Sequence, residues 1–398
     1  MKKSAMYLLL TITALFWFSL YTYPVLMTGF AKGELGATPQ VAGAIVGSYG
    51  LTQTLLRTPL GFLSDRLRRR KPFLSLGLAL STLAALGLWL AQSPTVALLA
   101  RGTAGMAAAS WVAFSVLYAS YSAGGGARAM GTLSAVMYAA QLLGTLCGGG
   151  LARAAGTRSA FVLAVIVGGA GLLLSAKVTD VRPQGETPSL RALLSVIRDR
   201  LLLCSAGLTT LMQIIMWATL YGFSPQWARE ALGANEMHLA LLSALHLLPN
   251  ILFSWLTGTV LVPRLGSRIV TAAGFVCMAL CCAGLPFTTA FWQMLCLQVV
   301  CGIGTGCVAP VLLALCIHDI PAEKRGMGMG IYQALYGIGM FTGPMIAGAL
   351  IDAVSPVVAG VAQYAVGYRA NFWAMAAVGA LGAALSLCLL RRRDGMDG

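Results

Sequence analysis

The chain has 398 residues, of which 58% are hydrophobic and only 10% are charged, and its mean hydropathy is +0.81. A soluble globular domain carries about 25% charged residues. A chain this apolar cannot cover a water-exposed surface with polar groups. The composition therefore excludes a cytoplasmic enzyme, a secreted disulfide scaffold and a disordered regulator, and it leaves a polytopic membrane protein.

Twelve segments are long and apolar enough to cross a bilayer as helices, which takes about 20 residues each. We expect these spans at 5–29, 41–63, 72–91, 95–119, 129–151, 159–178, 201–225, 238–262, 268–288, 290–316, 326–350 and 368–390. The first follows two lysines, as a signal peptide does, but its apolar stretch is too long and lacks a cleavage site. The weak period-2 alternation argues against a membrane β-barrel. We predict an all-α membrane protein.

The positive charges indicate the orientation of these spans. When the spans alternate in direction, most of the 27 Lys and Arg residues fall in the loops on one side. Cytoplasmic loops carry such an excess, so we expect a multi-pass protein of the cytoplasmic (inner) membrane with both termini in the cytoplasm. The clusters account for the net charge of +15 and suit the anionic lipid of the inner leaflet. We expect the lipid bilayer and no nucleic acid as a partner, and a monomer.

No residue pattern indicates a cofactor, a metal or an enzyme. All ten cysteines fall inside the predicted spans, where free cysteine behaves as a small hydrophobe. The glycine-rich stretches 302–306 and 326–330 mimic phosphate loops but lack the strand–turn–helix context. We therefore predict no cofactor, no metal site and no catalytic constellation.

The chain reads as two related halves. A polar stretch at 180–200 separates six spans from six, so we predict an N-terminal six-helix bundle over 1–179, a cytoplasmic linker over 180–200 and a C-terminal six-helix bundle over 201–398. Trp17 and Tyr21 in the first span match Trp217 and Tyr221 in the seventh. Such a duplication predicts two pseudo-symmetric bundles with a cavity between them.

The loop between the second and third spans carries a motif. Residues 61–71 read GFLSDRLRRRK. This resembles the signature G-x-x-x-D-R-x-G-R-R/K of the major facilitator superfamily, with Arg68 where the family usually has glycine. Span number, half-length repeat and motif sites extend the resemblance over essentially the whole chain, and the 12-span drug/metabolite antiporter type is the most similar. The resemblance implies the family's fold of two six-helix bundles.

In that family the loop is thought to act as a conformational switch, and the residues present fit such a role. Gly61 permits close helix approach, and Asp65 can lie near a helix N-terminus of the other half, where the dipole favours a carboxylate. Arg66 and Arg69, with Arg70 beside them, can bridge to carboxylates or helix C-termini. The alternative is a plain positive-inside anchor.

Two arginines lie within predicted spans. Arg101 opens the stretch Arg101-Gly-Thr-Ala-Gly105, which resembles the family's second motif, and lies about 9 Å deep. An intramembrane arginine usually faces a cavity or a partner, and the resemblance implies a role in proton coupling; the alternative is snorkelling to the headgroups. Arg57 could contact an anionic substrate, snorkel, or pack against a carbonyl freed by Pro59.

Small residues recur in the fifth and eleventh spans. Gly144, Gly148 and Gly149 resemble the family's exporter motif G-P-x-x-G-G, with Thr145 in place of the proline. The eleventh span holds a related set, consisting of Gly339, Gly343, Pro344 and Gly348. Glycines at such spacing allow close helix packing, and a proline allows a kink.

Aromatic and polar residues mark the expected substrate cavity, because such sites combine apolar walls with few polar groups. The candidates are Trp17, Tyr21, Arg57, Tyr138, Gln141, Trp217, Tyr221, His246, Tyr332, Gln333 and Tyr336. For each residue the alternative is a packing role, and for His246 packing is the commoner role. We expect no Asp or Glu deep in a span, because Glu34 and Asp352 fall at outer helix ends and the others in loops.

These features predict a secondary active transporter that works by alternating access on a small-molecule substrate. The resemblance favours proton-coupled efflux of a drug-like or amphipathic metabolite, with a proton as the coupling partner. One alternative is an uptake symporter or facilitator for a small organic solute, including an anion attracted by Arg57 and Arg101. A non-transporting receptor on the same fold is the third.

Overall fold

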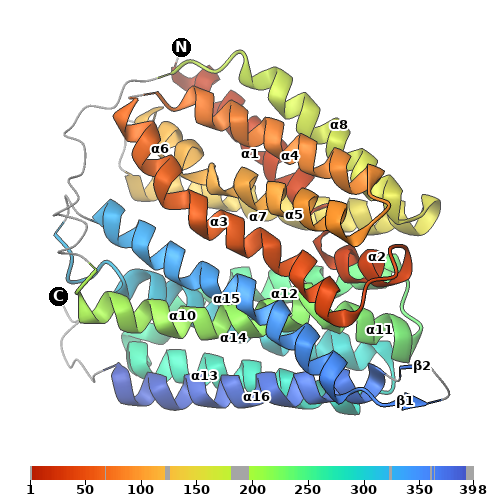
Figure 1. Ribbon diagram of the computed structural model, residues 1–398. Coiled ribbons are helices and arrows are strands. Elements are labelled where there is room, and N and C mark those ends of the chain that lie inside the picture. Colours follow the sequence, from red (N-terminus) through yellow and green to blue (C-terminus); the bar gives the residue numbers. More distant parts are fainter. Residues whose placement is uncertain are drawn as a thin grey trace.

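Helices form nearly all of the described chain, as a computed structural model shows (Figure 1). The structure describes residues 2–67, 69–121, 126–180, 197–321, 325–358, 361–362 and 364–390. A two-residue strand pair, β1 (Val357–Val358) and β2 (Val361–Ala362), is the only sheet within these ranges. The prediction of an all-α membrane protein is confirmed.

The first half contains α1 (Lys2–Tyr21), the 3-10 turn η1 (Pro24–Leu26), α2 (Met27–Gly33), α3 (Pro39–Arg66), α4 (Lys71–Leu90), α5 (Pro94–Ala109), α6 (Trp111–Tyr121), α7 (Gly126–Ala155) and α8 (Thr157–Ser175). The second half contains α10 (Arg200–Ala218), the π-turn η2 (Thr219–Phe223), α11 (Ser224–Leu232), α12 (Glu236–Leu256), the π-turn η3 (Thr257–Leu261), α13 (Val262–Gly284), η4 (Leu285–Phe287), α14 (Phe291–Leu315), α15 (Arg325–Val354) and α16 (Tyr364–Leu389).

Each of the twelve expected spans coincides with one helix or a broken pair of helices. Length and composition alone select ten stretches of the described chain as candidate spans. One of them, Glu236–Phe287, joins two spans, and Gly266 turns the chain between them at φ +78°. The remaining span is α3, which is long enough but less apolar because it carries Arg57 and several polar residues.

Short polar side chains mark where several helices begin. Ser93 caps α5 by accepting a hydrogen bond from the Val96 backbone N–H. Asp199 accepts from the Leu202 N–H at 2.8 Å, and Asn235 accepts from the His238 N–H at 3.0 Å. A cap of this kind satisfies a backbone donor that the first helical turn leaves free, so these residues fix the ends of the spans.

The helices form two bundles, α1–α8 and α10–α16, which lie one above the other in Figure 1. The bundles meet along α3 against α15 and along α7 against α12. At one end of the molecule lie the N-terminus and the loop between α3 and α4, where the Lys71 Nζ donates to the Ala176 carbonyl at 2.7 Å. We call this the basic end. The opposite end holds α2, α11 and the β1–β2 pair.

The outer surface of both bundles is apolar. Leu173 is 78% exposed, and Trp255 and Trp292 are each 63% exposed. Exposing so much apolar surface to water is unfavourable. The hydrocarbon core of a bilayer solvates it.

Glycines bring backbones into direct contact where the two bundles meet. A Cβ on Gly47 of α3 would lie 2.7 Å from the Phe341 carbonyl oxygen of α15, and one on Gly43 would meet the Pro344 carbonyl. A Cβ on Gly348 would in turn meet the Pro39 carbonyl of α3. Small residues are enriched at such membrane interfaces because they let helices approach closely.

The predicted packing glycines lie against backbone within and between the bundles. A Cβ on Gly144 would lie 2.6 Å from the Phe18 carbonyl, and one on Gly148 would meet the Thr22 carbonyl. The other members contact Glu236 (from Gly149), Thr210 (from Gly339) and Ile214 (from Gly343). Gly61 differs, because a Cβ there would meet only Val112 at 3.8 Å. The structure has no close helix approach at Gly61, contrary to expectation.

Gly148→Val should destabilise the protein, whereas Gly150→Val should not. The first substitution forces side-chain atoms into the Thr22 backbone, just after α1, and overpacking of this kind costs about 1–3 kcal/mol. Gly150 lies on the same helix with nothing within 4 Å of its Cβ position. The apparent melting temperature of each purified variant in detergent measures the difference, and equal values would show that this contact is not limiting.

Candidate functional site

An aromatic cluster joins the two bundles at the centre of the molecule. The rings of Tyr21 and Tyr221 meet edge to face with centroids 6.4 Å apart. Tyr49 of α3 stacks on Trp217 of α10 at 5.3 Å. Each pair has one ring from each bundle, and aromatic pairs at these separations attract beyond simple burial. The two pairs therefore form a layer that closes the space between the halves, which we call the aromatic layer.

The repeated residues predicted from the sequence take part unequally in this layer. Tyr21, Tyr221 and Trp217 face the other bundle. Trp17 instead packs on Trp111 at 5.3 Å, inside its own half. The twofold pattern of the sequence is thus broken at the tryptophan.

The first span of each half is interrupted just beyond this layer. Pro24 opens the turn η1 between α1 and α2, because proline has no N–H to continue a helix. In the second half the π-turn η2 separates α10 from α11, and such π-bulges are frequent at functional sites. The Thr28 hydroxyl donates to the Gly222 carbonyl of η2 at 2.6 Å, which ties the two interruptions together.

Arg101 lies behind the aromatic layer. Its side chain is 2% exposed, and its guanidinium carbon lies 4.4 Å from the centre of the Tyr49 ring and 5.6 Å from that of Tyr23. Its Nε and Nη1 have no hydrogen-bond partner in the described part of the chain. Arg101 thus does not snorkel to the surface here. It borders a small cavity, without room for a water molecule in this state, that is lined by Leu20, Tyr21, Pro24, Tyr49, Trp217 and Tyr221.

Gly105 lies one turn further along α5 and packs on the same aromatic wall. A Cβ there would meet the Tyr49 carbonyl oxygen and the Thr52 hydroxyl of α3. The glycine therefore lets α5 approach α3 closely enough for Arg101 to reach the ring of Tyr49.

Arg57 is the second buried arginine between the halves. It is 4% exposed, and its Nη1 donates to the Tyr336 hydroxyl of α15 at 3.2 Å. This contact joins the bundles and excludes snorkelling in the present state. Arg57 lies eight residues after Tyr49 on α3, which places it about 12 Å nearer the basic end.

A second small cavity lies on the other side of the two tyrosines. Gln141 and Thr145 of α7 border it together with Ser243 of α12, and its open volume of about 10 Å³ corresponds to a single water. The Thr145 hydroxyl donates to the Tyr21 carbonyl at 3.0 Å. Tyr138, two turns before Thr145 on α7, is 36% exposed.

Three further residues predicted for the cavity do not join this cluster. His246 is buried between α12 and α14, with its Nε2 3.4 Å from the Thr305 hydroxyl. Tyr332 is hydrogen-bonded to Thr209 at 2.8 Å inside the second half. Gln333 is partly buried on α15. For His246 and Tyr332 these contacts agree with the alternative of a packing role.

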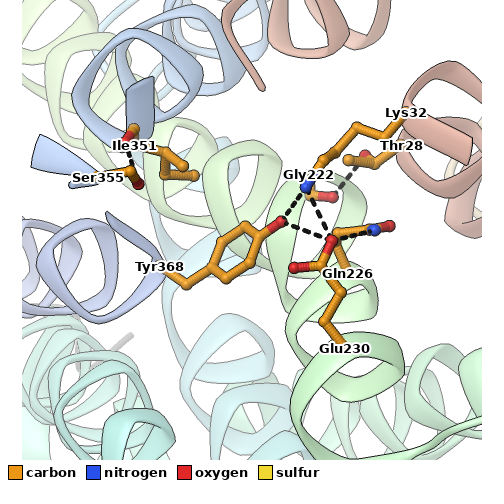
Figure 2. Close-up of polar contacts among 8 residues, drawn as sticks. All are labelled: Thr28, Lys32, Gly222, Gln226, Glu230, Ile351, Ser355 and Tyr368. Atoms are coloured by element: carbon orange, nitrogen blue, oxygen red, sulfur yellow. Dashed lines mark hydrogen bonds and ion pairs between the residues drawn. The ribbon is translucent and has the colours of Figure 1, made fainter. Parts of the chain in front are cut away.

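An ion pair crosses between the halves at the opposite end, and Figure 2 shows its surroundings. The Lys32 Nζ lies 2.8 Å from the Glu230 Oε1 and also donates to the Tyr368 hydroxyl. Glu230 accepts further hydrogen bonds from Tyr368 at 3.1 Å and from Gln226 at 2.6 Å. We call Lys32, Glu230 and Tyr368 the polar latch.

Aromatic rings surround the cation of the polar latch. The Lys32 Nζ lies 4.1 Å from the centre of the Tyr364 ring and 5.1 Å from that of Tyr368. An ammonium over an aromatic face is attracted by the ring quadrupole. The Lys32 side chain is only 9% exposed, against 37% for Glu230, so water reaches the carboxylate more readily than the cation.

The expectation that Lys32 and Glu230 lie in loops is wrong. They lie on α2 and α11, which continue the first and seventh spans. The repeat carried no usable signal, because at its offset of 200 residues Lys32 corresponds to Leu232 and not to Glu230.

The described hydrogen bonds between the halves are confined to one part of the molecule. Besides those of Thr28 and the polar latch, the Gln40 backbone N–H donates to the Asp352 Oδ2 at 2.8 Å. Arg57 to Tyr336 is the member of this set nearest the basic end. In the described residues the halves are therefore held together from the middle of the molecule to the opposite end.

The motif at 61–71 is described only in part. The side chain of Asp65 and all of Arg68 lie outside the described residues. Arg66 and Arg69 are exposed, whereas Arg70 is buried and its Nη1 donates to the Ser64 hydroxyl. The Arg70 backbone N–H donates to the Asp180 carboxylate at 3.0 Å, which attaches the loop to the segment that follows α8.

Comparison with known proteins agrees with this architecture. The Tetracycline resistance protein, class C, of Escherichia coli is 26% identical over 328 residues, which is 78% of this chain and 80% of that protein. A bacterial homolog of the human lysosomal transporter Spinster, in an inward-facing and unoccupied conformation, superposes with a TM-score of 0.79 at 16% identity, covering 98% of this chain and 96% of that one. The nucleoside transporter NupG gives a TM-score of 0.73 at 13% identity, covering 96% and 99%.

The family model of the Major Facilitator Superfamily matches residues 9–224 and again residues 206–397, one match for each half. Together the two matches cover nearly the whole chain, and the twelve spans and two bundles agree with them. This chain belongs to the Major Facilitator Superfamily, and it is a membrane transport protein of that family.

Proposed function

We propose that this chain exports a small amphipathic solute across the cytoplasmic membrane in exchange for protons, by alternating access. The observation that carries the proposal is the one-sided placement of the hydrogen bonds between the halves within the described residues. The described cross-half hydrogen bonds run from Arg57 to the opposite end. A transporter in one of its two end states has this geometry, because a gate closed on one side leaves the other side able to open.

The charge distribution supports the proposed orientation in the membrane. The basic end carries Arg66, Arg69, Arg70 and Lys71, and cytoplasmic loops concentrate Lys and Arg. With the basic end in the cytoplasm, the polar latch lies on the outer side, and the present state is closed to the outside. In this scheme the motif at 61–71 stabilises the other end state, in which the basic end is closed.

Export is favoured by the aromatic layer and by the relative that resembles this chain over most of its length. A solute that contacts Tyr21, Tyr221 and Trp217 has apolar or aromatic surface of its own. The E. coli relative is named for tetracycline resistance, and resistance fits removal of a solute from the cell better than its uptake. Uptake by a symporter or facilitator is the alternative that the first experiment separates from export.

The polar latch gives protons a way to act on the gate. Glu230 faces Lys32, Tyr368 and Gln226, and more than a third of its side chain is exposed at the opposite end. A proton on this carboxylate removes the charge that holds Lys32 and weakens the closure of the outer side. Arg101, behind the aromatic layer, would then link solute binding to the same transition.

In inverted membrane vesicles, an imposed acid-inside gradient should drive accumulation of an amphipathic solute. A panel of aromatic anions, aromatic cations and sugars is offered, and radiolabel retained on a filter measures uptake. We expect loss of accumulation when an ionophore collapses the gradient. Accumulation only when the interior is alkaline would show movement in the direction of the proton, which is uptake by symport.

The Glu230→Gln and Lys32→Met variants should populate the outward-open state more than the parent protein does. Loss of a charge-assisted hydrogen bond removes about 1.5–3 kcal/mol of stabilisation, which predicts an increase of at least tenfold in labelling of a cysteine at Leu20 by an impermeant thiol reagent added outside. Leu20 is 1% exposed in the closed state and borders the cavity behind the aromatic layer.

Arg158→Gln supplies the matched control for this labelling experiment. Arg158 pairs with Glu34 at 2.9 Å at the same end of the molecule, but both residues belong to the first half. Breaking this pair should leave the labelling rate unchanged. An equal increase for the control would assign the effect to general loosening of the opposite end.

The orientation has a test of its own. A single reactive cysteine at position 190, in the expected linker, should be labelled in inverted vesicles and be protected in intact cells. Labelling from outside intact cells would reverse the orientation, and the polar latch would then lie on the cytoplasmic side.

A further inference from the structure

We infer that Arg101 binds the negative charge of the solute, and that the solute is an aromatic organic anion. This inference rests on the proposed transport function and names the chemical class of its substrate. It starts from the buried positive charge of Arg101, which has no negatively charged partner among the described residues.

Arg101 is a buried cation with no carboxylate beside it among the described residues. The arginine guanidinium stays protonated in proteins. The ion pairs of the described residues are Lys32–Glu230, Arg158–Glu34, Arg229–Glu236 and His318–Asp319, and none includes Arg101. Burial of an unpaired charge is strongly unfavourable, so a residue placed in this way is expected to gain a counter-charge at another stage of its cycle.

Two guanidinium nitrogens, Nε and Nη1, are available for that counter-charge. The rings of Tyr49 and Tyr23 interact with the guanidinium, but Nε and Nη1 have no acceptor within the described residues. A buried donor without an acceptor is costly. A carboxylate or phenolate oxygen supplies both an acceptor and a negative charge, and hydrogen bonds between ions are about twice as strong as neutral ones.

The surroundings of Arg101 select an aromatic ring as the rest of the solute. The cavity beside it is lined by Tyr21, Tyr49, Trp217 and Tyr221, together with Leu20 and Pro24. None of these residues carries a charge, and four present aromatic faces or edges. A planar ring can stack here while its acidic group reaches the guanidinium.

The cavity is closed in the present state, and its closure depends on both halves. Tyr21 and Tyr221 meet edge to face across the gap, and Tyr49 stacks on Trp217 across the same gap. Relative movement of the bundles separates both pairs at once. The space that a solute needs therefore appears during the transition that moves it.

Arg57 extends the positive potential toward the basic end. It lies between the halves, its Nη1 bonds only the neutral Tyr336 hydroxyl, and its Nε has no partner among the described residues. A path that passes Arg57 and ends at Arg101 attracts anions and repels cations, since charges in a low-dielectric interior interact strongly. We therefore place organic cations outside the substrate class.

Binding to the purified full-length protein tests the inference with three probes of one shape: 1-naphthoate, neutral 1-naphthamide and cationic 1-naphthylmethylammonium. Calorimetry and the ligand-induced shift in melting temperature are the readouts, and neither requires transport. We expect 1-naphthoate to bind at least tenfold more tightly than either other probe, and to raise the melting temperature of the parent protein.

The Arg101→Gln variant should lose at least tenfold in affinity for 1-naphthoate and should bind 1-naphthamide as the parent does. Without ligand, this variant should melt no lower than the parent, because the substitution removes an unpaired buried charge. Arg101→Lys should recover part of the affinity for the anion, and Arg57→Gln should weaken it less than Arg101→Gln does.

The results distinguish this inference from the proposed function. Absence of 1-naphthoate binding, equal binding of the three probes, or an unchanged affinity in Arg101→Gln would overturn the anion site. Export of neutral or cationic solutes together with any of these results would support the proposed transport function and contradict the anionic substrate. Tight, Arg101-dependent binding of 1-naphthoate without flux in vesicles would support the anion site and contradict the proposed export.

Discussion

The hydrocarbon core of the membrane is the constraint on which the rest of this structure depends. Backbone polar groups in that environment must be satisfied within the protein, which imposes helices. Because lipid is as apolar as leucine, burial of apolar surface does not drive helices together in the membrane. Close van der Waals packing drives their association instead. Close backbone contacts such as that of Gly47 with the Phe341 carbonyl therefore contribute to the attraction between the halves, and polar groups are stable where the protein shields them from lipid.

That constraint explains why polar side chains concentrate between the bundles. Arg57, Arg101 and Lys32 each lie against residues of a tyrosine-rich surface, and Lys32 alone among them has a carboxylate partner in the described chain. An ion pair between the halves stabilises one conformational state and is broken in the other. Lys32, which has a counter-charge, therefore fits a role in closing a gate. Arg57 and Arg101, which have none among the described residues, fit a role along the proposed solute path.

The sequence was sufficient for the fold and insufficient for the polar contacts between the halves. The number of spans and the repeat of Tyr21 at Tyr221 can be read from hydropathy and spacing along the chain, without knowledge of contacts between distant residues. The partners of Lys32 could not be read in the same way, because Glu230 and Tyr368 are distant in sequence and α11 looked like a loop: its Pro225, Gln226 and charged residues hid a helix. Trp17 shows the converse, since a repeat predicts the position of a residue and does not predict which neighbour its side chain meets.

The position of Arg101 behind the aromatic layer bears on how solute and conformation are coupled. Tyr21 and Tyr221 meet beside it and line the same cavity, and the polar latch closes the opposite end. A ligand shifts a conformational equilibrium only by its differential affinity for the two states. An arginine with a carboxylate of its own would be equally well satisfied with and without solute, and would favour neither. An arginine without one is satisfied only in the loaded protein, so its unpaired charge can make the binding of an anion alter the balance between the two states.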